Sequence, residues 1–150
     1  MENNEKIKVA LFYAGSHLEE KTVEAESEED YSSLIGCKNE YSLCSLKYQS
    51  LKIGSKTYAI FYDREKTSSS WYGADCIPSV TNDNFGYILY GNVVISNKGK
   101  NGFSSLTKAD FENIQNHIGY LIGWNLSKAF LFPALRTNDE TIDKTLMRDF

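Results

Sequence analysis

The densest run of strand-forming residues lies at residues 87–96, Tyr-Ile-Leu-Tyr-Gly-Asn-Val-Val-Ile-Ser. β-branched and aromatic residues favour a pleated, buried surface, and alternation puts apolar groups on both faces of this run. A strand that is apolar on both faces lies inside a sheet with both faces covered. The run therefore predicts a central strand, in which Gly91 marks a bulge or the close approach of another backbone.

Further strands are predicted on either side of this run. With 150 residues, 41% of them hydrophobic, the chain is long enough for one domain with a substantial core. Residues 7–14 form an apolar run typical of an interior strand, and residues 41–48 alternate in the way of a half-buried strand. Residues 57–63 form its antiparallel partner across a long loop at 49–56, and 128–132 form a short strand that Pro133 ends.

Three capping patterns predict three helices. Ser27 with Asp30 opens a short helix that Gly36 closes, and Thr107 with Asp110 opens a second helix. The apolar stripe of this second helix continues through Phe111, Ile114, Ile118, Leu121 and Ile122. Thr137 with Glu140 opens a final helix that runs to the C-terminus. The predicted fold class is α+β, a mostly antiparallel sheet with packed helices and an additional C-terminal helix.

Charge and cysteine content narrow the functional classes. The formal net charge is −4, and residues 17–30, which the pattern predicts to be a solvated loop and helix start, hold seven of the 20 acidic residues. No basic stripe is present, which argues against a nucleic-acid binder. The three cysteines form no CxxC pair, so we expect reduced thiols, no metal site and no cofactor. Neither a secretory signal nor a long apolar run occurs, which predicts a cytoplasmic protein without a membrane span.

Between residues 6 and 118 the chain resembles a small domain-of-unknown-function family of phages, plasmids and some large viruses. The resemblance rests on short motifs in the same order: Leu34-Ile35-Gly36-Cys37, Tyr62-Asp63-Arg64-Glu65, Ile77-Pro78-Ser79, Leu89-Tyr90-Gly91-Asn92-Val93-Val94-Ile95 and Leu106-Thr107. The chain has Cys37 where the family has a second glycine, and Ser79 where it has asparagine. No activity is established for the family. The resemblance implies a phage or mobile-element setting, with residues 6–118 as the family-like core and 119–150 as an extension.

The residues favoured for binding are Tyr62, Arg64, Trp71 and Tyr72. Aromatic side chains and an arginine on loops can stack on a base or anchor a protein surface, although ordinary loop packing also explains them. Together with the resemblance, they predict a non-enzymatic accessory protein that sequesters a small, nucleotide-like ligand or inhibits a host protein such as a defence factor. The alternative is a small hydrolase-like enzyme that uses His17 or His117 with a nearby carboxylate.

The segment after residue 118 is rich in large apolar residues, which include Trp124, Phe130, Leu131 and Phe132. Two explanations stay open for what covers them. They fold back onto the sheet of the same chain, or they form the interface of a symmetric homo-oligomer.

Overall fold

The structure is a computed structural model that describes residues 5–36, 46–64, 77–82, 87–100, 102–125, 128–137 and 148–149. The strands are β1 Lys6–Phe12, β2 Leu18–Glu24, β3 Leu46–Ile53, β4 Lys56–Asp63, β5 Pro78–Asn82, β6 Tyr87–Tyr90, β7 Val93–Gly99, β8 Gly102–Ser104, β9 Ile118–Asn125, β10 Lys128–Thr137 and β11 Arg148–Asp149. The two helices described are α1, Glu28–Ile35, and α3, Lys108–Asn116. All strand pairs are antiparallel except β5 with β10, so the predicted mostly antiparallel α+β fold is confirmed.

The strands form two sheets. The larger has the order β11-β3-β4-β7-β1-β2, with β8 paired to β7, and the smaller has the order β6-β5-β10-β9. The predicted central strand is two strands. Residues 87–90 belong to the smaller sheet and residues 93–99 to the larger one. Gly91, whose φ of 79° is accessible at low cost only to glycine, separates them.

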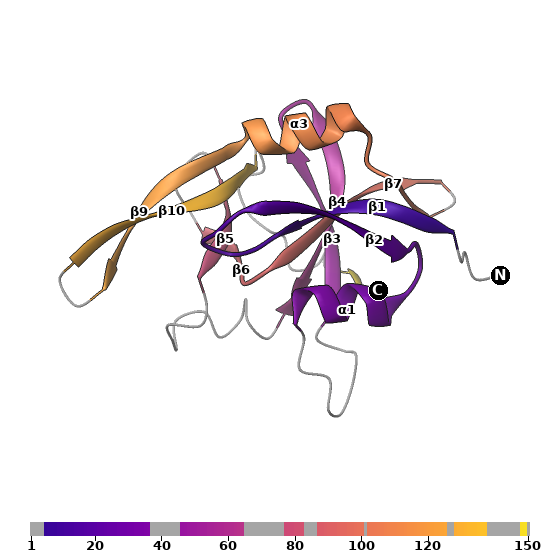
Figure 1. Cartoon of the computed structure of the whole chain (residues 1–150), viewed down its shortest axis with the longest axis horizontal. Helices are drawn as coiled ribbons and strands as arrows, with labels where there is room; N and C mark the ends of the chain where they lie inside the picture. Colours follow the sequence, from indigo (N-terminus) through magenta and orange to yellow (C-terminus); the bar gives the residue numbers. More distant parts are fainter. Residues whose placement is uncertain are drawn as a thin grey trace.

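The larger sheet is covered on both faces (Figure 1), with α3 beside one face and α1 beside the other. Within β7, Val93 and Ile95 point into the core shared with α3 and the smaller sheet, while Val94 points into the core shared with α1. The strand β7 pairs with β4 on one side and β1 on the other. This part of the predicted central strand is therefore confirmed, and β1 is an interior strand as expected.

The acidic segment is a strand instead of a solvated loop. Residues 18–24 form β2, which pairs with the whole of β1 and lies at the edge of the larger sheet. Residues alternate between the two faces of β2, so Glu20 and Glu24 are exposed on one face, while Glu19 lies on the face of the buried Val23. The helix α1 begins as predicted, because the Ser27 side chain accepts from the Asp30 amide, and Gly36 closes it with φ 81°. The Asp30 carboxylate, however, accepts from the amide of Glu24 instead of Ser27.

The hairpin of β3 and β4 is tighter than predicted. Residues 49–53 continue β3, and Ile53 pairs with Lys56 across a two-residue turn at Gly54 and Ser55. The positive φ of Gly54, 65°, is what such a short turn requires. The predicted long loop at 49–56 is therefore wrong, while β4 matches the predicted strand. Residues 41–45 of the other predicted strand lie outside the described residues.

The predicted second helix is too long. The capping box of Thr107 and Asp110 is present, but α3 ends at Asn116, and residues 118–125 form β9. The spacing of Ile118, Leu121 and Ile122 fits both a helix and a strand, and pairing with β10 selects the strand.

Strand β10 continues through Pro133, although the sequence predicted that Pro133 would end it. Its pairing with β5 begins only at Leu135, so the missing amide of Pro133 costs that ladder nothing.

The C-terminal helix is not observed. Residues 138–147 and 150 lie outside the described residues, and Arg148–Asp149 form strand β11, which pairs with β3. Thr137, predicted to cap that helix, is the last residue of β10 and donates from Oγ1 to the carbonyl of Lys52 at 2.7 Å.

Candidate functional site

Two of the four predicted site residues, Tyr62 and Arg64, lie within the described part of the chain. Tyr62 is fully buried near the end of β4, and Arg64 follows that strand and is exposed. Burial raises the pKa of Tyr62 to about 12, against a smaller lowering by the positive charge of Arg64. These two residues therefore lie close enough to interact, although Tyr62 is a core residue and not a loop residue. Trp71 and Tyr72 lie outside the described residues.

A polar group that the sequence analysis missed lies next to Tyr62. The register pairs Lys47 with Tyr62 and Gln49 with Ile60, so Lys47, Gln49 and Tyr62 share one face of β3 and β4. Gln49 is 5% exposed. Among the residues described, neither the Tyr62 hydroxyl nor the Gln49 Oε1 atom has a hydrogen-bond partner. Gln49 could have been found as a glutamine inside an alternating run of polar and apolar residues. It was missed because residues 49–56 were predicted to be a loop.

Two unpartnered buried polar atoms on one sheet face are unusual. Burial of a hydroxyl or amide without a partner costs about 1–3 kcal/mol, so such groups in native proteins call for an explanation. Lys47 lies on the same sheet face, and Arg64 follows the end of β4. Lysine and arginine side chains pair with anions, and hydroxyl and amide groups form hydrogen bonds with polar edges. We call Lys47, Gln49, Tyr62 and Arg64 the β3–β4 polar group.

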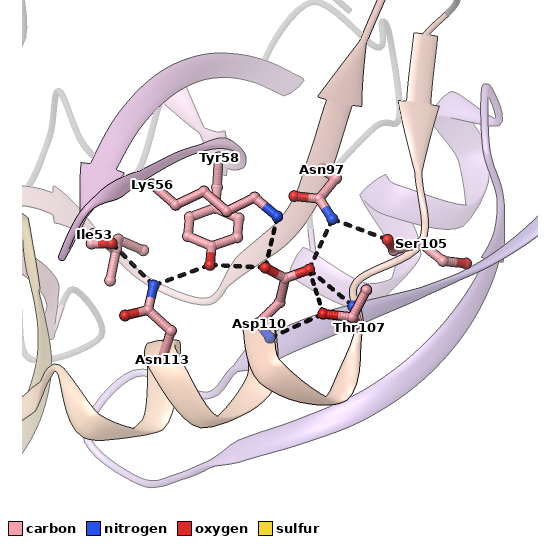
Figure 2. A network of polar contacts seen from close by, with 8 residues as sticks. All are labelled: Ile53, Lys56, Tyr58, Asn97, Ser105, Thr107, Asp110 and Asn113. Carbon is pink, nitrogen blue, oxygen red and sulfur yellow. Dashed lines mark hydrogen bonds and ion pairs between the residues drawn. The ribbon is translucent and has the colours of Figure 1, made fainter.

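A second polar cluster surrounds Asp110 and is completely paired (Figure 2). Oδ1 accepts from Lys56 Nζ at 2.7 Å and from the Tyr58 hydroxyl at 3.1 Å. Oδ2 accepts from Asn97 at 2.9 Å and from the Thr107 amide at 2.8 Å. Asn113, one turn along α3, donates to Tyr58 and to the Ile53 carbonyl, both at 3.0 Å. The cluster thus joins the start of α3 to β4 and β7, which is a structural task.

The Asp110 carboxylate makes the stability of the fold depend on pH. Burial alone raises its pKa, but hydrogen bonds from Lys56, Thr107 and Asn97 outweigh that effect and hold the pKa well below the usual 3.8. A lowered folded-state pKa contributes stability that is complete above the unfolded-state value and is lost as the pH falls below it.

We therefore expect the urea midpoint of the wild-type protein to fall more steeply between pH 5 and pH 2 than that of Asp110→Asn, which has no carboxylate to titrate. Parallel curves for the two proteins would contradict a contribution from Asp110.

His17 lies in the turn between β1 and β2 and is hydrogen-bonded on both ring nitrogens. Nδ1 lies 2.7 Å from Ser16 Oγ, and Nε2 lies 3.0 Å from Glu19 Oε1. Hydrogen bonds with His17 and then Lys21 lower the pKa of Glu19 to about 2. The carboxylate beside His17 is thus Glu19, a neighbour in sequence. Ser16 and His17 belong to this turn and Glu19 to the start of β2, and both contacts are exposed.

His117, the other histidine considered for catalysis, has a structural setting. It caps the C-terminus of α3, and its Nδ1 lies 2.7 Å from the Asn113 carbonyl. A Cβ atom added at Gly54 would come within 2.8 Å of the His117 ring, so the ring packs against the β3–β4 turn. Among the described residues, the side chain of His17 bonds to Ser16 and Glu19, whereas that of His117 bonds to Asn113, so the two histidines share no partner.

The hairpin of β9 and β10 extends away from the body of the molecule (Figure 1). Tyr120, Ile122 and Leu131 are 72%, 59% and 69% exposed. Ile122 pairs with Leu131, and Tyr120 pairs with Pro133, so these side chains lie on one face of the hairpin. Phe132 and Ala134, on the other face, are buried. The hairpin is therefore anchored by one face and presents an apolar surface on the other.

Comparison with known proteins adds no relative: no family model matches the chain, and no curated protein or solved structure matches it significantly. Within the described ranges, no helix is long and apolar enough to cross a membrane. The same part of the chain holds no group of three or more histidine, cysteine or acidic residues that could bind a metal ion.

Proposed function

We propose that this protein is a non-enzymatic binding protein that sequesters a small anionic, nucleotide-like ligand at the β3–β4 polar group. The observation that carries the proposal is the pair of buried, unpartnered atoms, Tyr62 Oη and Gln49 Oε1, on one sheet face. A bound ligand would supply the missing partners, and Lys47 and Arg64 would balance its negative charge. By resemblance, the setting is that of an accessory protein of a phage or mobile element acting in the host cytoplasm.

Binding explains the structure better than the hydrolase alternative does. A general base needs a ring nitrogen that can reach a substrate proton, whereas both nitrogens of His17 are engaged within its own turn. His117 is held by the end of α3 and packs against Gly54. Inhibition of a host protein remains the second candidate, and the exposed apolar face of β9 and β10 supports it.

Replacing Tyr62 by phenylalanine tests the ligand site. Because the hydroxyl is buried without a partner, Tyr62→Phe should raise the stability of the free protein by about 1 kcal/mol. Tyr58→Phe is the matched control, on the same strand and face. Its hydroxyl contacts Asp110 and Asn113, so its loss should destabilise by about 1–3 kcal/mol. Urea unfolding measures both, and destabilisation by Tyr62→Phe would remove the basis of the proposal.

The ligand itself is tested by thermal shift and calorimetry with adenosine and guanosine mono-, di- and triphosphates, with inorganic phosphate and the free nucleosides as controls. We expect wild-type protein to be stabilised by at least one nucleotide, and Tyr62→Phe, Gln49→Leu and Arg64→Ala each to reduce that shift. No shift with any nucleotide, or an equal shift in all variants, would refute a nucleotide site at these residues.

A further inference from the structure

Strand β9 forms an edge of the smaller sheet, and no other described strand pairs with its outer side. An open edge presents unpaired backbone groups, and proteins protect such edges with charged residues or proline. The edge strand β2 of the larger sheet follows that rule, with Glu19, Glu20, Lys21 and Glu24 among its seven residues. The eight residues of β9, Ile-Gly-Tyr-Leu-Ile-Gly-Trp-Asn, include neither a charge nor a proline.

The register with β10 shows which backbone groups of β9 point outward. Tyr120 lies opposite Pro133, which has no amide hydrogen, so these two residues cannot form a mutually hydrogen-bonded pair. The Arg136 amide donates to the His117 carbonyl at 2.8 Å, which assigns the inward bonds to the odd-numbered residues. By alternation, the amides and carbonyls of Ile118, Tyr120, Ile122 and Trp124 face the open edge.

The two glycines of β9, Gly119 and Gly123, are equally spaced about Leu121. In an antiparallel pair of two copies centred there, Gly119 lies opposite Gly123, Tyr120 opposite Ile122, and Ile118 opposite Trp124. The pair of Tyr120 with Ile122 joins an aromatic residue to a β-branched one, a favourable cross-strand combination. The outward-facing even residues meet each other, so their hydrogen bonds form in register. The two glycines, which lack side chains to pack, also meet.

We propose that the occupant of this edge is a second copy of the chain. Two β9 strands pair antiparallel about a two-fold axis at Leu121 and join the two smaller sheets into one continuous sheet of eight strands. One strand per copy is a small interface, so the dimer is expected to be weak, with a dissociation constant of roughly micromolar order. This proposal is independent of the ligand site at β3 and β4.

Two substitutions at Ile122 separate edge pairing from simple contact between apolar faces. Ile122→Pro removes an outward amide but leaves the bonds to β10, whereas Ile122→Thr keeps the amide and removes apolar surface. Sedimentation analysis over a concentration series should show a wild-type dimer, and Ile122→Pro should weaken it about tenfold or more, well beyond the effect of Ile122→Thr. A larger effect of Ile122→Thr, or a monomer at every concentration, would overturn the proposal.

A cysteine at the two-fold axis gives a readout that does not depend on the proline variant. Residue 121 lies opposite itself in the dimer, so Leu121→Cys should form an intermolecular disulfide on mild oxidation. Ile122→Cys is the control because residue 122 faces residue 120, and wild-type protein sets the background of the native cysteines. Cross-linking of Ile122→Cys as fast as Leu121→Cys, or of neither above wild type, would exclude this register.

Discussion

Asp110→Ala should destabilise the protein by about 3 kcal/mol or more, the largest effect expected of a single substitution described here. It removes the N3 half of the capping box, the bond from the Thr107 amide, at about 1 kcal/mol. It also leaves the hydroxyl of Tyr58 and the amide of Asn97 each with one partner fewer, at about 1–3 kcal/mol. The ion pair with Lys56 adds little, because the Lys56 side chain is 47% exposed. Urea unfolding at neutral pH measures the loss.

Glu112→Ala is the matched control, since Glu112 lies on the same helix and is exposed. It should change the free energy of unfolding by no more than about 0.5 kcal/mol. Equal effects of the two substitutions would mean that the Asp110 cluster does not hold α3 on the sheet. The double variant with Asp110→Ala and Asn97→Ala should lose clearly less free energy of unfolding than the sum of the losses in the two single variants, because both substitutions remove the same contact.

Gly91→Val should destabilise by about 2–4 kcal/mol. The reason lies in the backbone: φ is 79° at the point where the chain leaves β6 and enters β7, and a β-branched residue tolerates that conformation poorly. Gly91 is also buried, and its amide donates to the Ile77 carbonyl at 2.9 Å, so the turn cannot relax easily. Thermal and urea unfolding both report the change.

Gly99→Val is the appropriate comparison. Gly99 is exposed, lacks a positive φ, and an added Cβ would meet nothing closer than 3.9 Å. We expect an effect below about 1 kcal/mol there. If valine has the same effect on stability at both glycines, the left-handed backbone at Gly91 does not constrain the fold as we infer.

Local signals predicted the parts of the fold that depend on local physics. The starts of α1 and α3 followed from Ser27 and Thr107, because a capping side chain bonds to its own helix. The interior position of β1 and the two buried faces around Val94 followed from apolar runs. The secondary-structure predictions were wrong where pairing with a distant segment determines whether residues form a helix, a strand or a loop. Ile118–Asn125 carries both periodicities, and only the register with β10 selects the strand.

In the candidate site, too, the residue types could be predicted from the sequence, whereas their contacts with distant segments could not. Tyr62 and Arg64 were predicted as binding residues because they are an aromatic residue and an arginine. The burial of Tyr62 could not be predicted in this way, because it depends on the core that covers β4. Gln49 could not be linked to Tyr62 without the β3–β4 register, which the expected long loop concealed. Asp110 was recognisable as a member of a capping box, whereas its bonds to Tyr58 and Asn97 depend on how α3 packs against β4 and β7.

The parallel pairing of β5 with β10 also sets the order of events during protein synthesis. Val80 lies opposite Leu135, so β5 cannot complete this ladder until the much later strand β10 has been synthesised. Contacts between such distant segments slow folding, and strand edges that await their partners are prone to aggregate. The hairpin of β5 and β6 therefore keeps one strand edge unpaired until β10 has been made, and that interval is when this part of the chain is most exposed to aggregation.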